Sequence, residues 1–260
     1  MSDKTVVAFD AYGTLLSTES IAKKLASHFG QEKAQTIAAT WRKYQLEYTW
    51  RLNSMGEWLV YTSLPQTSLT ISDQYEDFSK ITNRSLLHAL AECKVSLQDK
   101  DIEELMKAYD SLSTFPDVGP ALEALKKKDN IHAVVFSNGT HTMVSSSVNN
   151  SPDLKPYSSV FKDVVVIEEI KKFKPAPEVY YHLARKVGKD PKSKSDMGSM
   201  WLVSGNPFDV AGARAVGMQA AWVDRAGNGW QDALIPGEHG GPTVIVKSLE
   251  EVVSAVSKNA

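Results

Sequence analysis

The chain has 260 residues, of which 42% are hydrophobic and 23% are charged, and its formal net charge at pH 7 is -2. This length suits one large α/β domain or a domain with a sizeable insertion, and the apolar content allows a substantial core. The small net charge gives no long-range attraction toward nucleic acid, and no apolar stretch reaches the roughly 18 residues of a membrane span. We therefore expect neither nucleic acid nor membrane as a partner.

The N-terminal residues and the cysteine content indicate an expected location. Met1 to Lys4 lead straight into an apolar run, which leaves no room for a signal peptide. Cys93 is the only cysteine, so the chain can form no internal disulfide and no thiolate metal cluster. The expectation is a reducing, cytoplasmic setting.

Six short runs of apolar, β-forming residues predict the strands of a sheet. Most are continuous, as in parallel sheets that are covered on both faces, and helical patterns separate most of them. Such alternation predicts an α/β fold with a Rossmann-like, doubly wound parallel sheet. The predicted strands span residues 6–9, 132–136, 164–167, 201–203, 220–223 and 244–246, and the helical patterns span 121–128, 176–187, 209–216 and 249–256.

The segment 17–113 has a different pattern. It contains almost no strand-like run but long helical ones at 35–52 and 98–109, with breaks expected at positions such as Gly56. The plainest interpretation is a helical cap inserted after the first strand. The core would then consist of residues 1–16 and 114–260. A cap above the carboxyl edge of the sheet would shield a site there from water.

Asp10 stands where the first predicted strand ends and is followed by a turn at Gly13 and by Thr14. Open α/β sheets bind ligands at this edge. A carboxylate placed there can act as a nucleophile and form an ester or an acyl-phosphate.

A second polar cluster follows the second predicted strand. Ser137, Asn138 and Gly139 offer a hydroxyl, an amide and backbone N–H groups, which suit an anionic oxygen. An Asn-Gly pair is equally common as a plain turn, so this cluster alone leaves both interpretations open.

Two further clusters add a cation and a second carboxylate. Pro175 favours an extended conformation for Lys174, which would point into the site and neutralise a carboxylate or a bound anion. Ser204, Asn206 and Asp209 follow the fourth strand. Asp209 has two equal interpretations: a helix N-cap, or a carboxylate paired with Asp10.

The order of these four clusters resembles that of the haloacid dehalogenase superfamily, and the resemblance covers essentially the whole chain. Most members are phosphatases, which usually carry an acid two residues after the nucleophile. Here that position is Tyr12, whose phenol titrates near ~10 and is no useful acid at neutral pH. The acid that those phosphatases carry in the fourth cluster is Asn206 here. An alkyl halide needs neither acid, because halide leaves without protonation.

The cap strengthens the resemblance to one family. Residues 41–50 look like the cap helix of L-2-haloacid dehalogenases, in which the arginine that matches Arg42 helps to receive the departing halide. Asn138 matches a second residue near the halide, and Phe208 an aromatic wall of the pocket. Tyr12, Leu46 and Tyr61 would complete this apolar pocket. For Trp41, Trp50 and Trp58 simple core packing is the favoured interpretation.

The resemblance implies a mechanism. Asp10 attacks C2 of a short-chain L-2-haloacid, inverts that centre and forms an ester, which water hydrolyses to a D-2-hydroxy acid. Asp209, with Asn206 and Lys174, would orient the water. Ser137 would bind the substrate carboxylate. Thr14 and Ser204 would hold Asp10 and Lys174 in place, and Tyr180 would support the site.

The resemblance implies no cofactor and no metal, a small-molecule 2-haloacid as partner, and a homodimer formed through the cap. Lys43 and Pro207 depart from the family pattern and bear on the range of substrates. Two alternatives stay open: an Mg²⁺-dependent phosphatase with Asp10 and Asp209 as metal ligands, and a non-catalytic binding protein.

Overall fold

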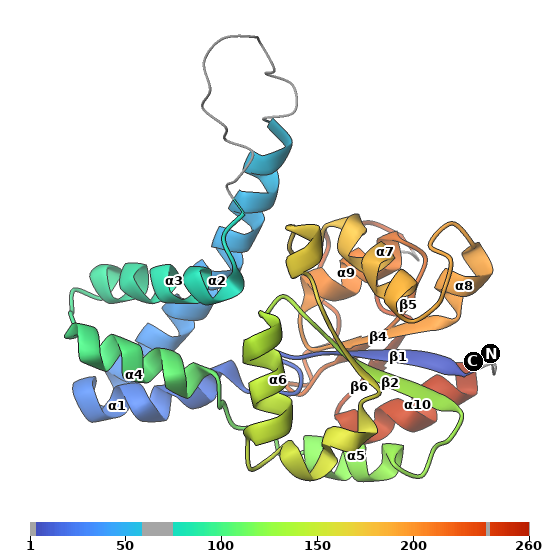
Figure 1. The fold of residues 1–260 in the computed structure, drawn as a ribbon, viewed down its shortest axis with the longest axis horizontal. Helices are drawn as coiled ribbons and strands as arrows, with labels where there is room; N and C mark the ends of the chain where they lie inside the picture. Colours follow the sequence, from blue (N-terminus) through green and yellow to red (C-terminus); the bar gives the residue numbers. More distant parts are fainter. Residues whose placement is uncertain (1–3, 59–74, 238–239, 260) are drawn as a thin grey trace.

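The computed structural model describes residues 4–58, 75–237 and 240–259. Six parallel strands form one sheet in the order β3-β2-β1-β4-β5-β6 (Figure 1). The predicted doubly wound parallel sheet is therefore confirmed. The strands are β1 Thr5–Asp10, β2 Ile131–Ser137, β3 Asp163–Val166, β4 Met200–Ser204, β5 Gln219–Val223 and β6 Val244–Val246.

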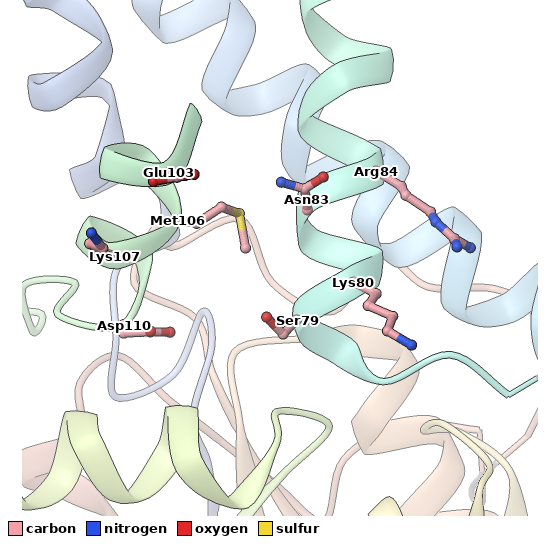
Figure 2. Close-up of a pocket in the computed structure, with 8 residues that line it drawn as sticks. All are labelled: Ser79, Lys80, Asn83, Arg84, Glu103, Met106, Lys107 and Asp110. Atoms are coloured by element: carbon pink, nitrogen blue, oxygen red, sulfur yellow. The ribbon is translucent and has the colours of Figure 1, made fainter. Parts of the chain in front are cut away.

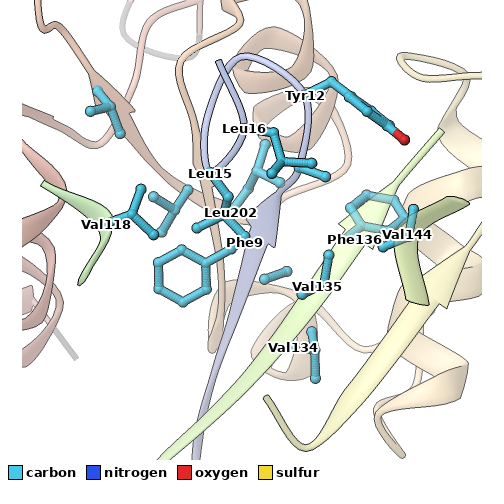
Figure 3. Close-up of a cluster of buried hydrophobic side chains, with 14 of the residues drawn as sticks. Phe9, Tyr12, Leu15, Leu16, Val118, Val134, Val135, Phe136, Val144 and Leu202 are labelled. Carbon is cyan, nitrogen blue, oxygen red and sulfur yellow. The ribbon is translucent and has the colours of Figure 1, made fainter. Parts of the chain in front are cut away.

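The central strand β1 is buried and carries Asp10 at its end. Phe9 pairs with Val135 on one side and with Val203 on the other, so Asp10 emerges between the ends of β2 and β4. Apolar side chains from these strands and from the loop after β1 pack around it (Figure 3). The buried apolar runs thus bring the polar clusters that follow them to one edge of the sheet.

Helices cover both faces of the sheet. The helices α5 and α10 pack together on one face, and α7 and α9 pack together on the other (Figure 1). The helices of this part are α5 Val118–Leu125, α6 His141–Asn150, α7 Pro177–Lys186, α8 Lys194–Gly198, α9 Pro207–Ala215 and α10 Val252–Asn259, with short 3-10 helices at Lys155–Val160, Glu168–Ile170 and Leu249–Glu251.

The helix α6 was not predicted, because its sequence is rich in serine and asparagine. Thr140 caps its start by accepting a hydrogen bond from the Met143 N–H at 3.2 Å. Met143, Val144 and Val148 are buried along one face. Capping and packing therefore stabilise a segment of low helix propensity.

The segment between β1 and β2 forms helices, as predicted. These are a 3-10 helix Thr18–Ile21 and the helices α1 Ala22–Phe29, α2 Gln31–Trp58, α3 Phe78–Glu92 and α4 Asp99–Tyr109. The expected break at Gly56 is wrong, since α2 continues to Trp58. Of the helices whose residues the structure describes, none combines the length and apolarity that crossing a membrane requires.

The two connections between these helices and the sheet run side by side. The Ser17 N–H donates to the Ser113 carbonyl at 2.8 Å, and the Phe115 N–H donates to the Leu15 carbonyl at 3.3 Å. This is where the sequence predicts the cap to begin and end. The division into a core of 1–16 and 114–260 and a cap of 17–113 stays a prediction.

An ion pair buttresses this junction. Arg225 donates to both carboxylate oxygens of Asp117, at 3.0 Å each, and to the Thr14 carbonyl at 2.8 Å. Asp117 also accepts from the Leu249 N–H at 2.8 Å. One carboxylate therefore joins the start of α5, the loop after β5 and the C-terminal segment behind the Asp10 loop.

Asp117→Ala should lower the free energy of unfolding by about 2 kcal/mol, because it leaves a half-buried guanidinium and a backbone N–H without their acceptor. Denaturant unfolding measures this. Glu169→Ala removes one partner of an exposed pair with Lys186 and should have no measurable effect. Equal losses in the two variants would contradict the buttressing role of Asp117.

Candidate active site

Asp10 is 6% exposed, and its two carboxylate oxygens have unequal surroundings. The Oδ2 atom accepts hydrogen bonds from Thr14 Oγ1 at 2.8 Å, from Asn206 Nδ2 at 2.7 Å and from Ser204 Oγ at 3.4 Å. The Oδ1 atom accepts one, from Lys174 Nζ at 3.1 Å. One oxygen is thus held by three neutral donors, and the other faces only the ammonium group.

Lys174 is 1% exposed, and its ammonium group lies between two carboxylates. Its Nζ is 3.1 Å from Asp10 Oδ1 and 2.7 Å from Asp209 Oδ2, and it donates to the Phe136 carbonyl at 2.8 Å. The three hydrogens of the ammonium therefore all have acceptors. Its charge makes the burial of two carboxylates tolerable.

Asp209 is fully buried and does not cap a helix. The N-cap residue of α9 is Asn206, so the capping interpretation of Asp209 is wrong. Its Oδ1 atom accepts from the Tyr180 hydroxyl at 2.7 Å. Burial raises the pKa of Asp209 to about 6, although Lys174 opposes that shift. Burial also raises the pKa of Tyr180 well above its usual value, so the phenol stays protonated and donates.

Arg42 reaches this cluster from the helix α2. It donates to the Tyr12 carbonyl at 3.1 Å and to Asn206 Oδ1 at 3.2 Å. The same Asn206 donates through Nδ2 to Asp10, which fixes the orientation of its amide group. A side chain of the segment between β1 and β2 is therefore linked to Asp10 through one asparagine.

The helix α2 presents a stripe toward the core. Leu46, Trp50 and Asn53 follow Arg42 at helical spacing, so the four side chains lie along one face. The Trp50 ring packs edge-on against Phe208, with centroids 5.4 Å apart. Leu46 is half-buried. Tyr61, which the sequence adds to the same pocket, lies outside the described residues.

The expectation of core packing holds for one tryptophan and fails for another. Trp41 is 1% exposed and donates from Nε1 to the Thr82 carbonyl at 2.8 Å. Trp50 is 39% exposed, because it lies on the stripe that faces Phe208. The side chain of Trp58 is outside the described part of the chain.

Asn53 makes a paired contact that the sequence did not suggest. Its Nδ2 donates to the Phe173 carbonyl at 2.7 Å, and its Oδ1 accepts from the Phe173 N–H at 2.9 Å. Phe173 directly precedes Lys174, whose own N–H donates to Asn138 Oδ1 at 2.9 Å. Two asparagines therefore hold the backbone that carries the lysine.

Tyr12 forms part of an aromatic wall. Its ring lies between Phe78 and Tyr109, at centroid distances of 5.4 Å and 5.7 Å, and points toward Val144 (Figure 3). Its hydroxyl has no hydrogen-bond partner among the described residues. Burial raises the pKa of Tyr12 well above its usual value, so this side chain is no acid.

The turn after β2 fits closely against this ring. A Cβ at Gly139 would come within 2.9 Å of a Tyr12 ring carbon and 2.8 Å of Val144, so only glycine fits. The Ser137 hydroxyl is fully buried and accepts from the Gly139 N–H at 3.0 Å. Ser137 and Asn138 therefore shape the turn beside Asp10 and Lys174.

Both carboxylates of this cluster are compensated by one lysine. Asp10 and Asp209, the metal ligands of the phosphatase alternative, both point at the Lys174 ammonium. In the described ranges no group of three or more histidine, cysteine or acidic side chains is placed to hold a metal ion. The donor set present favours charge compensation by lysine.

A separate pocket of about 440 Å³ lies between α3 and α4 (Figure 2). None of its lining residues belongs to the cluster around Asp10, and none was predicted as a site residue. The lining residues are Ser79, Lys80, Asn83, Arg84, Glu103, Met106, Lys107 and Asp110.

Gly212→Ala should destabilise the protein by about 1–3 kcal/mol through overpacking, although alanine normally favours a helix. The added Cβ would lie 2.7 Å from Pro175 Cβ and 2.8 Å from a ring carbon of Tyr180, so it would push Tyr180 away from Asp209. Denaturant unfolding tests this. Gly198→Ala, where the added Cβ meets no atom within 4 Å, should cost nothing. An unchanged free energy of unfolding in Gly212→Ala would show that the packing around Tyr180 can accommodate an added methyl group.

Comparison with known proteins agrees with this geometry. A family model described as haloacid dehalogenase-like hydrolase matches residues 4–217. (S)-2-haloacid dehalogenase 4A of Burkholderia cepacia is 29% identical over 96% of this chain and 94% of its own length. Haloacetate dehalogenase H-2 of Moraxella sp. (strain B) is 29% identical over 85% and 86%.

Among solved structures, the L-2-haloacid dehalogenase of Xanthobacter autotrophicus is 25% identical and superposes with a TM-score of 0.78. The match covers 99% of this chain and all of that chain. The chain belongs to the haloacid dehalogenase-like hydrolases.

Proposed function

We propose that this protein is a hydrolytic dehalogenase that converts short-chain L-2-haloacids to D-2-hydroxy acids and halide. The observation that carries the proposal is Tyr12, which lies buried among aromatic rings where a phosphatase of this family would need an acid. Relatives that are named haloacid dehalogenases over most of the chain support it. The phosphatase alternative is not favoured.

The unequal surroundings of the Asp10 oxygens assign them different roles. Oδ1 faces only Lys174, whereas Oδ2 is held by three donors. Oδ1 is therefore the better nucleophile. It forms a bond to C2 while the carbon–halogen bond breaks, and the halide leaves with the electron pair of that bond. C2 is inverted because attack comes from the side opposite the halide.

Hydrolysis of the ester uses the opposite oxygen. When water attacks Cγ of Asp10, negative charge develops on Oδ2, where donors from Thr14, Asn206 and Ser204 are already in place. A preorganised donor at about 2.7 to 3.1 Å is typically worth ~3 to 4 kcal/mol, and the donors from Thr14 and Asn206 meet that distance. Asp209 accepts the proton of the water, and burial makes it a stronger base than an ordinary carboxylate. The bond between Cγ and Oδ1 then breaks, and Oδ1 leaves with C2 as the hydroxyl oxygen of the product, which takes up the proton that Asp209 received. Asp10 regains its carboxylate with one oxygen from water.

Arg42 is suited to receive the halide. Among the described residues, Arg42 donates to the neutral oxygens of Gln45, Tyr12 and Asn206. No carboxylate of the described residues forms an ion pair with its guanidinium. Phe208 and Leu46 would bound the carbon skeleton, and the turn at Ser137 and Asn138 would receive the substrate carboxylate.

Asp10→Asn should lower halide release from 2-chloropropionate at least about a thousandfold, because the amide is a far weaker nucleophile. Halide release is measured for a panel of 2-haloacids, and phosphate release for a panel of phosphate esters, each with Mg²⁺ or with EDTA. The control is Asp163→Asn at the exposed start of β3, which should behave as wild type. The proposal would be refuted if wild-type protein released halide from none of the haloacids but hydrolysed phosphate esters with Mg²⁺.

Labelled water provides an independent check on the ester. In a single turnover ¹⁸O should enter the Asp10 carboxylate, while the product hydroxyl carries an oxygen from the enzyme. Label found first in the product would instead show direct attack of water on C2.

Ester hydrolysis should slow as the pH falls, because protonated Asp209 accepts no proton. Beside ionised Asp10 the Asp209 pKa is raised to about 6, and the Asp10 charge is one cause of that rise. Ester formation removes the Asp10 charge, so the pH midpoint of ester hydrolysis, measured in a single turnover, should lie below about 6. Tyr180→Phe removes a hydrogen bond that stabilises the ionised form, and should move the midpoint upward. A midpoint that moves downward would exclude Asp209 as the group that titrates.

A further inference from the structure

Gln45 is a fully buried amide in the helix α2 whose hydrogen bonds reach Arg42. Its Oε1 atom accepts from Arg42 NH1 at 2.8 Å and from the Tyr109 hydroxyl at 3.0 Å. Its Nε2 atom donates to Thr82 Oγ1 at 2.8 Å. A buried amide is costly without partners, so this set of contacts holds the side chain in one position.

The helix α3 determines which end of the amide faces Arg42. The Thr82 hydroxyl donates its only hydrogen to the Phe78 carbonyl at 2.6 Å, and so it can only accept from Gln45. The nitrogen of the Gln45 amide must therefore face Thr82, and its oxygen must face Arg42. The chain of hydrogen bonds runs from the backbone of α3 to the guanidinium group.

Gln45 holds Arg42 without cancelling its charge. A glutamate at this position would have the same shape and reach, but it would form an ion pair with the guanidinium. Such a pair would compete with an incoming anion, because opposite charges at this distance attract strongly in a buried site. The neutral amide fixes the position of Arg42 and leaves its full charge for a ligand.

We propose that Gln45 is a positioning residue, which holds the Arg42 guanidinium beside the Tyr12 carbonyl and Asn206 without supplying a counter-charge, so that the guanidinium binds the departing halide. This inference rests on the proposed dehalogenase function. The hydrogen-bond partners of Gln45 among the described residues are Arg42, Thr82 and Tyr109, and Asp10 is not one of them. It acts through Arg42, which contacts Asn206 and, through it, Asp10.

The test measures bromide binding by titration calorimetry on the full-length protein, without turnover. Gln45→Glu should weaken bromide binding about tenfold or more, because the new carboxylate neutralises Arg42. Gln45→Met, which is neutral and of similar size, should weaken it less. Thr82→Val leaves Gln45 in the chain but removes the hydroxyl to which its amide donates. This third variant should weaken bromide binding less than Gln45→Glu. Thermal unfolding of each variant records any loss of stability separately.

Thr49→Val is the matched control. Thr49 is fully buried one turn after Gln45 on the same helix, and its hydroxyl donates only to the Leu46 carbonyl at 2.6 Å. Bromide affinity should stay at the wild-type level in this variant, even where the melting temperature falls. If Gln45 contributed only to stability, Gln45→Glu would also lower the melting temperature and leave the bromide affinity at the wild-type level.

A double variant completes the test. With Arg42→Leu already present, Gln45→Glu should cause no further loss of bromide affinity. The inference is overturned if wild-type protein binds no bromide, if Gln45→Glu binds it as tightly as wild type, or if the loss persists without Arg42. Halide release from 2-chloropropionate is followed in parallel, so that failure of the dehalogenase proposal appears as an inactive wild type whatever its bromide affinity.

Discussion

The Lys174 ammonium lies between two buried carboxylates, and the arrangement around the carboxyl edge of the sheet depends on it. Asp10 and Asp209 would repel each other and lose hydration if no cation stood between them. Lys174 comes from the loop after β3, so that loop must approach both the end of β1 and the start of α9. The contacts of Asn138 and Asn53 with the loop backbone keep it there.

The helix α2 connects the two parts of the chain through one face. Along this face the Arg42 guanidinium contacts the Asp10 loop, Trp50 packs on Phe208, and Asn53 pairs with the backbone next to Lys174. Another face of α2, which includes Trp41, packs on α3. A rotation of α2 would therefore displace the Arg42 guanidinium, the contact of Trp50 with Phe208 and the backbone next to Lys174 together.

The sequence predicts the sheet and the placement of the polar clusters, because short apolar runs determine where each parallel strand ends. It does not predict the partners of side chains inside the helical segment. Gln45 contacts a residue 37 positions away and Asn53 one 120 positions away, and no local spacing reveals such contacts. A polar residue on the buried face of a helix was the available indication for Gln45. Trp50 was misjudged because hydrophobicity alone does not distinguish a core from a pocket wall.

The close packing around Tyr12 has a consequence for substitution at that position. An aspartate at that position would be smaller than the ring and would lie among Phe78, Tyr109 and the Gly139 turn. Its charged form would be disfavoured there, and the lost ring would leave a cavity in the aromatic wall. In this chain, an acid at position 12 would thus need further substitutions in the aromatic wall to refill the space that the ring occupies.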